Sequence, residues 1–289
     1  MNNSRLHLYS KFLTAATLVL IAAGGLVTST RSGLSVPDWP LSYGKLFPPM
    51  IGGIRFEHTH RVIAGLVGVL TLVLMIALLK TEKRPWLKGL GVAAFGAVIA
   101  QAVLGGLTVK YLLPAPISVL HACLAQSFFA LMASVALFTS REWLGEKPIL
   151  SENAASLRRL VLATSGFVFL QLFLGAVARH SANRASVGIH IAVAFLIVLH
   201  ALLTYLKISR EKTILGRLDR HAALFGLLAL IQIFLGFGSF VFTRMLEKTE
   251  APRLGAVLFT TAHQTLGALI LGLVVLLTIR IFRLYQKPL

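Results

Sequence analysis

Residues 58–80 read HTHRVIAGLVGVLTLVLMIALLK, and this stretch decides the fold. Its apolar part is long enough to cross the hydrocarbon core of a bilayer as one helix, which takes about 20 residues. Seven other stretches of the chain have the same length and character. We therefore predict an all-α integral membrane protein with eight transmembrane helices, at residues 11–29, 58–80, 89–109, 117–139, 159–179, 187–207, 221–243 and 255–279.

The composition indicates the same class of protein. Of 289 residues, 56% are hydrophobic and 13% are charged, whereas soluble domains carry about 25% charged residues. A net charge of +18 would also suit a nucleic-acid-binding protein. However, the Lys and Arg residues lie in short loops between apolar stretches, which is typical of membrane topology. We therefore expect the chain to contact the lipid bilayer and no nucleic acid.

The Lys and Arg residues also predict the orientation. Of the 28, 18 lie at the N-terminus, in the loops near 80–88, 140–159 and 207–220, and after residue 279. Cytoplasmic loops are the richer in these residues, so we predict that both termini are cytoplasmic and that the even-numbered helices begin at the outer face. Arg5 and Lys11 precede the first apolar stretch as in a signal peptide, but the internal repeat of the chain favours a retained helix.

That repeat is a helical hairpin present four times. The third, fifth and seventh helices share Gln-x-x-x-Gly, and the first keeps only Gly24; the even-numbered helices share His followed four residues later by Ala or Gly. The chain therefore divides into two four-helix halves, 1–145 and 146–289, inserted the same way up as a tandem parallel repeat and pseudo-symmetric about an axis along the membrane normal. We interpret the glycines as positions of close helix packing, and we expect the glutamine amides to need partners. The Gln/Gly pairs are Gln101/Gly105, Gln171/Gly175 and Gln232/Gly236.

Four histidines stand in register at the starts of the even-numbered helices: His60, His121, His190 and His263. Cofactor sites of helical bundles form from side chains on facing helices, which predicts the pairs His60 with His121 and His190 with His263. Two imidazoles without a thiolate are too few ligands for zinc but suit the iron of a haem, whose ring supplies the other ligands. The small residue four positions after each histidine would let a flat ring approach the helix.

Outer-side arginines are candidate partners for haem propionates through charge-assisted hydrogen bonds, although solvation at the membrane surface explains any single one of them as well. They are Arg55, Arg61, Arg179, Arg184, Arg244 and Arg253.

The two halves differ chemically at one position. Glu57 lies three residues before His60, on the same helical face, and the corresponding positions hold Ser118, Val187 and Thr260. A carboxylate beside a haem pocket is a candidate proton acceptor or cation stabiliser. We therefore expect chemistry in the N-terminal half and a permanent cofactor in the C-terminal half.

These residues resemble the haem A synthase family of bacteria and mitochondria over essentially the whole chain. The matching segments are GGLVTST at 24–30, GLSVPDWPLSYG at 33–44, EHTHR at 57–61, Gln171 to Gly175, Arg179-His180 and the four aligned histidines.

The resemblance implies an oxidoreductase that converts haem O to haem A, for terminal oxidases, by successive hydroxylation of a ring methyl to a formyl group. It implies catalytic roles for Glu57, His60 and His121, with substrate haem O held by His60, His121 and Arg61, and haem b iron held by His190 and His263. It further implies a bacterial cytoplasmic membrane location with the haem sites towards the outer face. The implied partners are haem O synthase as the source of substrate and a quinone or another electron carrier.

One departure from the family concerns the first outer loop, residues 31–56. Many bacterial members carry two cysteines there, and this chain carries none. We expect the loop to form a lid over the N-terminal site with a short amphipathic helix, held by packing, and Asp38 to cap a turn. The residues expected to pack are Pro37, Trp39, Pro40, Phe47, Pro48 and Pro49.

Two other functions fit parts of the pattern. Four bundle histidines alone also suit a quinol-linked cytochrome with bis-histidine haem b that transfers electrons without modifying haem. A transporter built on a tandem repeat, with histidines that relay protons, is a third candidate. The scarcity of acidic residues within the helices disfavours the transporter.

Overall fold

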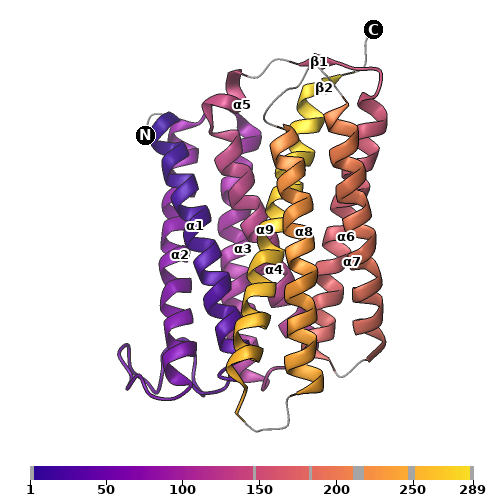
Figure 1. Cartoon of the computed structure of the whole chain (residues 1–289). Coiled ribbons are helices and arrows are strands. Elements are labelled where there is room, and N and C mark those ends of the chain that lie inside the picture. The colour runs from indigo at the N-terminus through magenta and orange to yellow at the C-terminus, as the bar shows by residue number, and fades with distance from the viewer. Residues whose placement is uncertain (1–2, 146–147, 182–183, 211–217, 247–250, 287–289) are drawn as a thin grey trace.

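The computed structural model describes residues 3–145, 148–181, 184–210, 218–246 and 251–286 as a bundle of long, roughly parallel and antiparallel helices (Figure 1). Within these residues, eight helices are long and apolar enough to cross a membrane, as the sequence predicts. The long helices are α1 (Asn3–Ser29), α2 (Ile54–Thr81), α3 (Pro85–Lys110), α4 (Ala115–Phe138), α6 (Ala154–His180), α7 (Arg184–Ser209), α8 (Leu218–Phe240) and α9 (Leu254–Leu284).

Most helices extend beyond the apolar stretches that predict them, since α1 begins at Asn3 instead of residue 11 and α9 ends at Leu284 instead of residue 279. Hydropathy marks only the part of a helix that matches the hydrocarbon core, and polar ends continue the backbone hydrogen bonds beyond it. α8 continues into a π-helical turn, η2 (Val241–Met245).

The helices pack as two rings of four. α1, α2, α3 and α4 contact one another in sequence and α4 closes on α1; α6, α7, α8 and α9 do the same. The rings meet where α9 contacts α1 and α4, and where α4 contacts α6. α4 and α9 are therefore the most enclosed helices. The division after residue 145 and the axis relating the halves stay predictions.

The outside of the bundle is apolar, as a lipid-facing surface requires. Large side chains such as Leu66, Phe195 and Phe234 are about as exposed as surface residues of a soluble protein, at 59%, 61% and 63%. Tightly buried clusters lie within each ring: Leu13, Leu74 and Leu78 among others in the first, and Phe225, Leu271 and Val274 in the second.

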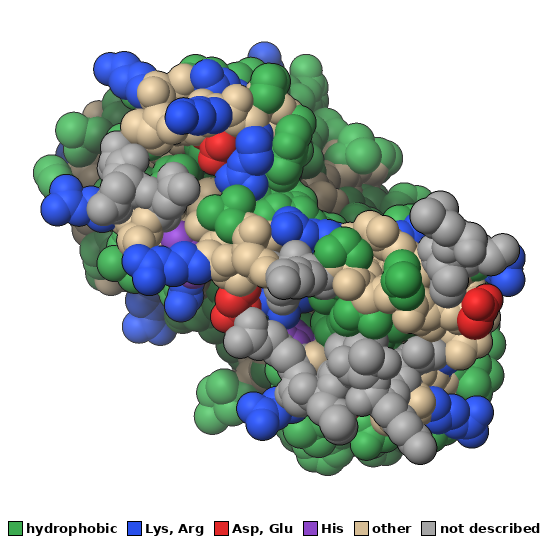
Figure 2. Space-filling model, turned by 90° about the horizontal axis from the view of Figure 1, so that it is seen from above, with side chains coloured by type: hydrophobic (Ala, Val, Ile, Leu, Met, Phe, Trp, Pro, Cys, Tyr) green, Lys and Arg blue, Asp and Glu red, His purple; other side chains and the backbone are tan. Residues whose placement is uncertain are grey.

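Both termini lie at the same end of the bundle (Figure 1), and Lys and Arg side chains recur over that end face (Figure 2). Two short strands pair in parallel there: β1 (Ile149–Leu150), which precedes α6, and β2 (Tyr285–Gln286), which follows α9; the short helix α5 (Arg141–Gly145) precedes β1 in the chain. The Arg280 guanidinium, almost completely buried, donates to the Glu142 carboxylate at 3.0 Å. Which side of a membrane this end faces stays a prediction.

Candidate functional site

Each of the four aligned histidines rests on a glycine of the preceding helix. A Cβ atom built on Gly24, Gly175 or Gly236 would lie 2.9–3.0 Å from Cε1 of His60, His190 or His263, respectively, and one on Gly105 would lie 3.5 Å from Cε1 of His121. A side chain at 2.9–3.0 Å would require the ring to move, whereas 3.5 Å at Gly105 is an ordinary van der Waals contact. The glycines therefore serve the imidazoles, beyond the close helix packing that the sequence suggests.

The glutamines of the same motif have a shared partner. Nε2 of Gln101, Gln171 and Gln232 donates to the backbone carbonyl oxygen of His121, His190 and His263 at 3.0, 2.9 and 2.9 Å. A carbonyl oxygen has two lone pairs, so it accepts this bond in addition to one from its own helix. The repeated sequence motif is thus a repeated contact between the two helices of a hairpin.

One of the small residues four positions after the histidines touches this contact: a Cβ on Gly267 would lie 3.3 Å from Nε2 of Gln232. Gly267 and Ala194, the corresponding residue after His190, also line the cavity described below. That these small residues let a flat ring approach stays a prediction.

His190 and His263 face each other across the second ring of helices. Their ring centroids lie 6.1 Å apart and their planes are inclined by 74°. α7 and α9 each contact α6 and α8, so the two histidines approach from opposite corners of the ring. Two imidazoles bound on opposite sides of one metal atom, with bonds of about 2 Å, have centroids roughly 6 Å apart.

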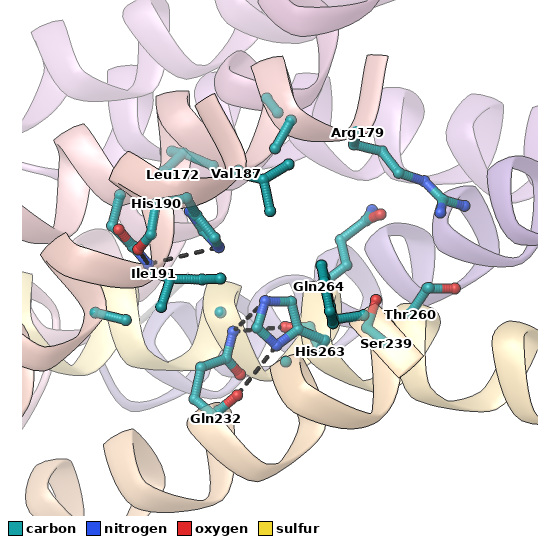
Figure 3. A pocket seen from close by; sticks show the side chains of 18 of the residues that line it. Leu172, Arg179, Val187, His190, Ile191, Gln232, Ser239, Thr260, His263 and Gln264 are labelled. Atoms are coloured by element: carbon teal, nitrogen blue, oxygen red, sulfur yellow. Dashed lines mark hydrogen bonds between the residues drawn. The ribbon is translucent and has the colours of Figure 1, made fainter. Parts of the chain in front are cut away.

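One cavity of about 870 Å³ contains this pair (Figure 3). Ligand pockets commonly measure about 300–1,000 Å³. The wall is mostly apolar, with Val168, Leu172 and Ile270 among the lining residues. His263 Nδ1 lies 3.2 Å from the Gln232 carbonyl oxygen. If Nδ1 carries the proton and donates there, Nε2 keeps its lone pair for a ligand.

The cavity is basic where α1, α6 and η2 come together. Arg179 and Arg244, both candidate propionate partners from the sequence, line it. Arg31, which the sequence did not single out, lines it as well, and so does His180, which belongs to the matching segment Arg179-His180 but had no predicted role. Arg179 donates to Ser29 Oγ at 3.5 Å, and Ser29 Oγ lies 2.6 Å from Thr260 Oγ1. Cationic and hydroxyl groups at one end of an apolar cavity suit a ligand with carboxylates. The Arg184 side chain lies outside the described residues.

In the first ring, His60 and His121 come from α2 and α4, which likewise occupy opposite corners because each contacts α1 and α3. Across the described residues, no group of three or more His, Cys, Asp or Glu side chains is placed to hold a metal ion. Either histidine pair would therefore need a metal that brings further ligands of its own.

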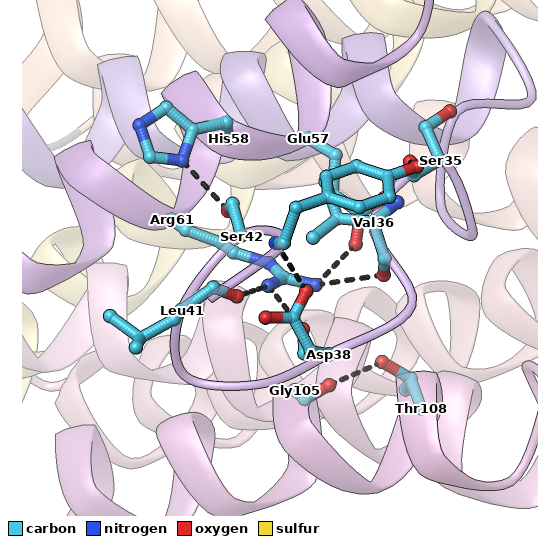
Figure 4. A network of polar contacts seen from close by, with 11 residues as sticks. Ser35, Val36, Asp38, Leu41, Ser42, Glu57, His58, Arg61, Gly105 and Thr108 are labelled. Carbon is cyan, nitrogen blue, oxygen red and sulfur yellow. Dashed lines mark hydrogen bonds and ion pairs between the residues drawn. The ribbon is translucent and has the colours of Figure 1, made fainter. Parts of the chain in front are cut away.

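Glu57 lies in a network that fastens the first loop to α2 (Figure 4). Its side chain is buried; Oε1 accepts from Arg61 Nη2 at 2.6 Å and Oε2 accepts from the Val36 amide at 2.9 Å. Arg61 also donates to three loop carbonyl oxygens: those of Asp38 at 2.6 Å, Leu41 at 2.7 Å and Val36 at 3.3 Å. The Arg61 side chain of α2 thus contacts the first loop, and its pairing with a haem propionate stays a prediction.

Asp38 closes a turn inside the loop, as expected of an Asp before a turn. Its carboxylate accepts the amides of Tyr43 at 2.6 Å and Gly44 at 2.7 Å. These amides, first that of Gly44, lower the pKa of Asp38, and the Arg61 guanidinium lowers it further. The turn is therefore held by an ionised carboxylate at neutral pH.

The loop differs from its sequence-based picture in how it is held. Residues 31–53 contain no helix, and the Phe47 side chain is 91% exposed, so it packs against little. Trp39 does pack: a Cβ on Gly106 would lie 2.9 Å from its ring. Hydrogen bonds donated by Arg61 and accepted by the Asp38 carboxylate supply most of the named contacts. Hydropathy could not reveal them, because the partners of both side chains are mostly backbone atoms.

Comparison with known proteins finds a matching family model and several relatives that share one name. The model of a family described as "Cytochrome oxidase assembly protein" (COX15-CtaA) matches residues 54–187. Proteins named "Heme A synthase" from Exiguobacterium sibiricum and from an Exiguobacterium species are 29% and 30% identical to the chain, over 64% of it and 63% and 62% of their own lengths. A "Heme A synthase" from Symbiobacterium thermophilum is 30% identical over 61% of this chain and 60% of its own.

The chain thus spans a little over 60% of the length of the first two of these relatives. The family match includes Glu57, His60, Arg61 and His121, and it stops before His190 and His263. The geometry of the second histidine pair is therefore evidence independent of that match.

Proposed function

We propose that the chain is a haem A synthase of the COX15-CtaA family, whose model matches residues 54–187; the eight candidate membrane-spanning helices among the described residues support this assignment. In this proposal it oxidises a methyl group of haem O to a formyl group by successive hydroxylation and so provides haem A for terminal oxidases. The observation that carries the proposal is the set of four imidazoles, each seated on a glycine near one end of the bundle, with a carboxylate on the helix turn before only His60.

A resident haem b fits between His190 and His263. The 6.1 Å centroid separation suits two axial ligands, and the cavity joins an apolar interior to a basic end with Arg179 and Arg244. These arginines would bind the propionates, and the hydrogen bond from His263 Nδ1 to Gln232 would orient the imidazole. When bound, haem b supplies one-electron redox chemistry. The chain's own part is to hold the group and to exclude water from it.

Haem O, the substrate, would bind in the first ring between His60 and His121. Glu57 is the proposed proton acceptor for this site. Its ion pair with Arg61 and its bond from the Val36 amide fix its carboxylate beside the turn that carries His60. Each carboxylate oxygen can accept more than one hydrogen bond, so these contacts leave room for a proton or a polar group of the substrate.

The remaining parts of the proposal concern the membrane location, the orientation and the partners of the chain. The chain would lie in a bacterial cytoplasmic membrane with both termini in the cytoplasm and the histidines towards the outer face. Haem O synthase would supply the substrate, and a quinone or another carrier would take up electrons. The Lys and Arg asymmetry of the loops and the bacterial relatives support this arrangement.

Product analysis tests the proposal directly. The full chain is expressed in a bacterium that makes haem O but has no haem A synthase of its own, and the extracted haems are separated by chromatography. Haem A or its hydroxylated precursor is expected. A haem-loaded protein that yields only haem b and haem O would instead indicate an electron-transfer cytochrome.

Glu57→Gln should abolish product, because an amide cannot accept the proton, while the haem absorbance of both sites is kept. The change also weakens the loop network, so Asp38→Asn serves as the matched control: it loosens the same loop and leaves the Glu57 carboxylate in place. Equal loss of product in both variants would assign Glu57 a structural role only.

A further inference from the structure

Three of the four hairpins carry a side-chain hydrogen bond to the histidine's own backbone. In α3/α4, α6/α7 and α8/α9, the glutamine Nε2 donates to the histidine carbonyl oxygen at 2.9–3.0 Å. At His190 and His263 the same amide nitrogen also lies 3.5 Å from the imidazole Nε2. We call this contact the glutamine brace. It fixes the helix segment from which the imidazole projects.

The glutamine of the brace and the glycine that contacts the imidazole ring belong to the same Gln-x-x-x-Gly motif. Glutamine and glycine are four residues apart, one helical turn, and therefore share a face of the helix. The glycine lets the imidazole approach to within contact distance, and the glutamine one turn away holds the histidine's main chain. A ring clamped in this way loses little freedom when it binds a metal, because its orientation is already set.

The remaining hairpin, α1/α2, has a glycine in contact with the histidine ring, which we call the glycine seat, but it has no glutamine brace. Gly24 holds His60 as closely as Gly236 holds His263, with a Cβ-to-Cε1 distance of 3.0 Å in both. The residue one turn before Gly24 is Leu20, and a leucine side chain has no hydrogen-bond donor. The His60 carbonyl therefore receives no bond from position 20.

The two histidines of the first ring differ in this respect, whereas the two histidines of the second ring are alike. His190 and His263 are both braced, by Gln171 and Gln232; in the first ring His121 is braced by Gln101 and His60 is not. A permanent cofactor needs two firm ligands. A substrate that has to enter and leave as product needs at least one ligand that releases readily.

We propose that the glutamine braces set how firmly each histidine holds its haem iron, and that Leu20 makes His60 the exchangeable ligand through which the substrate site loads and unloads. Gln101, Gln171, Gln232 and Leu20 are positioning residues in this scheme, since they act through the histidines. The assignment of His60 rests on the proposed function; the effect of the braces on haem b does not.

The test measures haem release from the full-length protein in detergent or nanodiscs, loaded with haem b and haem O in the absence of an oxidant. Apomyoglobin captures the released haem, and chromatography separates haem O from haem b, so that each site is followed separately. In the wild-type protein we expect haem O to leave on the order of ten times faster than haem b, the scale of losing one supporting contact to a metal ligand.

Four variants test the brace. Leu20→Gln should slow haem O release about tenfold, Gln101→Leu should accelerate it, and Gln171→Leu and Gln232→Leu should each accelerate haem b release about tenfold. Leu20→Asn is the matched control, because it introduces the same amide on a side chain one methylene shorter, and it should behave like the wild type. Reduced Leu20→Gln protein should also bind less carbon monoxide, since an exogenous ligand must displace a histidine.

Different failures have different meanings. Unchanged haem b release from Gln171→Leu and Gln232→Leu would overturn the bracing role. Unchanged haem O release from both Leu20→Gln and Gln101→Leu would overturn the assignment of His60, and the second variant keeps the test valid if the first does not insert. A chain that takes up haem b but never haem O would overturn the proposed function together with that assignment, while the haem b measurements would still decide the bracing role.

Discussion

Single glycines set the orientation of the imidazole rings in this molecule. A methyl group on Gly175 would already lie 2.9 Å from the His190 ring, and tightly packed interiors do not absorb such a collision without moving a side chain. The ring edge that faces the glycine carries Cε1, with Nε2 farther from it. The glycine therefore contacts the Cε1 edge of the ring, and Nε2 lies farther from the glycine, near the amide of Gln171 at 3.5 Å.

Gly175→Ala should displace the His190 ring and lower the haem b content of the purified protein. Overpacking of this kind costs about 1–3 kcal/mol, enough to weaken a bound ligand strongly without unfolding a helix. A pyridine haemochrome spectrum counts the haem. Gly166→Ala is the control on the same helix, because a Cβ there would meet nothing within 4 Å. Equal haem loss in both variants would contradict the role of the seat.

The helices were predictable because eight stretches are apolar throughout, and their length alone separates them from the loops. The repeat also marked Gln171 and Gln232 as polar residues in need of partners. It could not identify the partner, since a backbone carbonyl leaves no sequence signal. The loop of residues 31–53 was the least predictable element, because Arg61 shapes it by reaching main-chain oxygens at residues 36, 38 and 41.

Arg61→Gln should open the first loop. The guanidinium bonds to the Asp38, Leu41 and Val36 carbonyl oxygens would be lost, and bonds from a charged donor contribute about 1.5–3 kcal/mol each when buried. Because part of this network is exposed, we expect a loss of about 2 kcal/mol, a roughly thirtyfold shift towards the open loop. Trypsin cleavage after Lys45 should accelerate accordingly. A cleavage rate equal to that of the wild type would show that the Arg61 hydrogen bonds do not hold the loop closed.

At the scale of the whole molecule, the four aligned histidines lie at one end of the bundle and most Lys and Arg residues belong to the other. The four helices that carry the aligned histidines all begin at the end opposite the termini (Figure 1). His60, His121, His190 and His263 lie within the first three turns of these helices and therefore towards that end. Eighteen of the 28 Lys and Arg residues belong, by sequence, to the terminal segments and to the loops predicted on the same side. Positive loops stay in the cytoplasm, so the same distribution that orients the chain predicts outer-side haem sites.

Cysteine labelling of intact cells tests this orientation. In a Cys123→Ala background, which removes the single native cysteine, Leu46→Cys places a thiol in the first loop at a side chain that is 70% exposed. Lys83→Cys places one in the exposed turn between α2 and α3, on the terminal side. A membrane-impermeant maleimide should label only the loop thiol in intact cells and both thiols after lysis. Labelling of the α2/α3 turn alone in intact cells would reverse the orientation, and with it the side on which haem is modified.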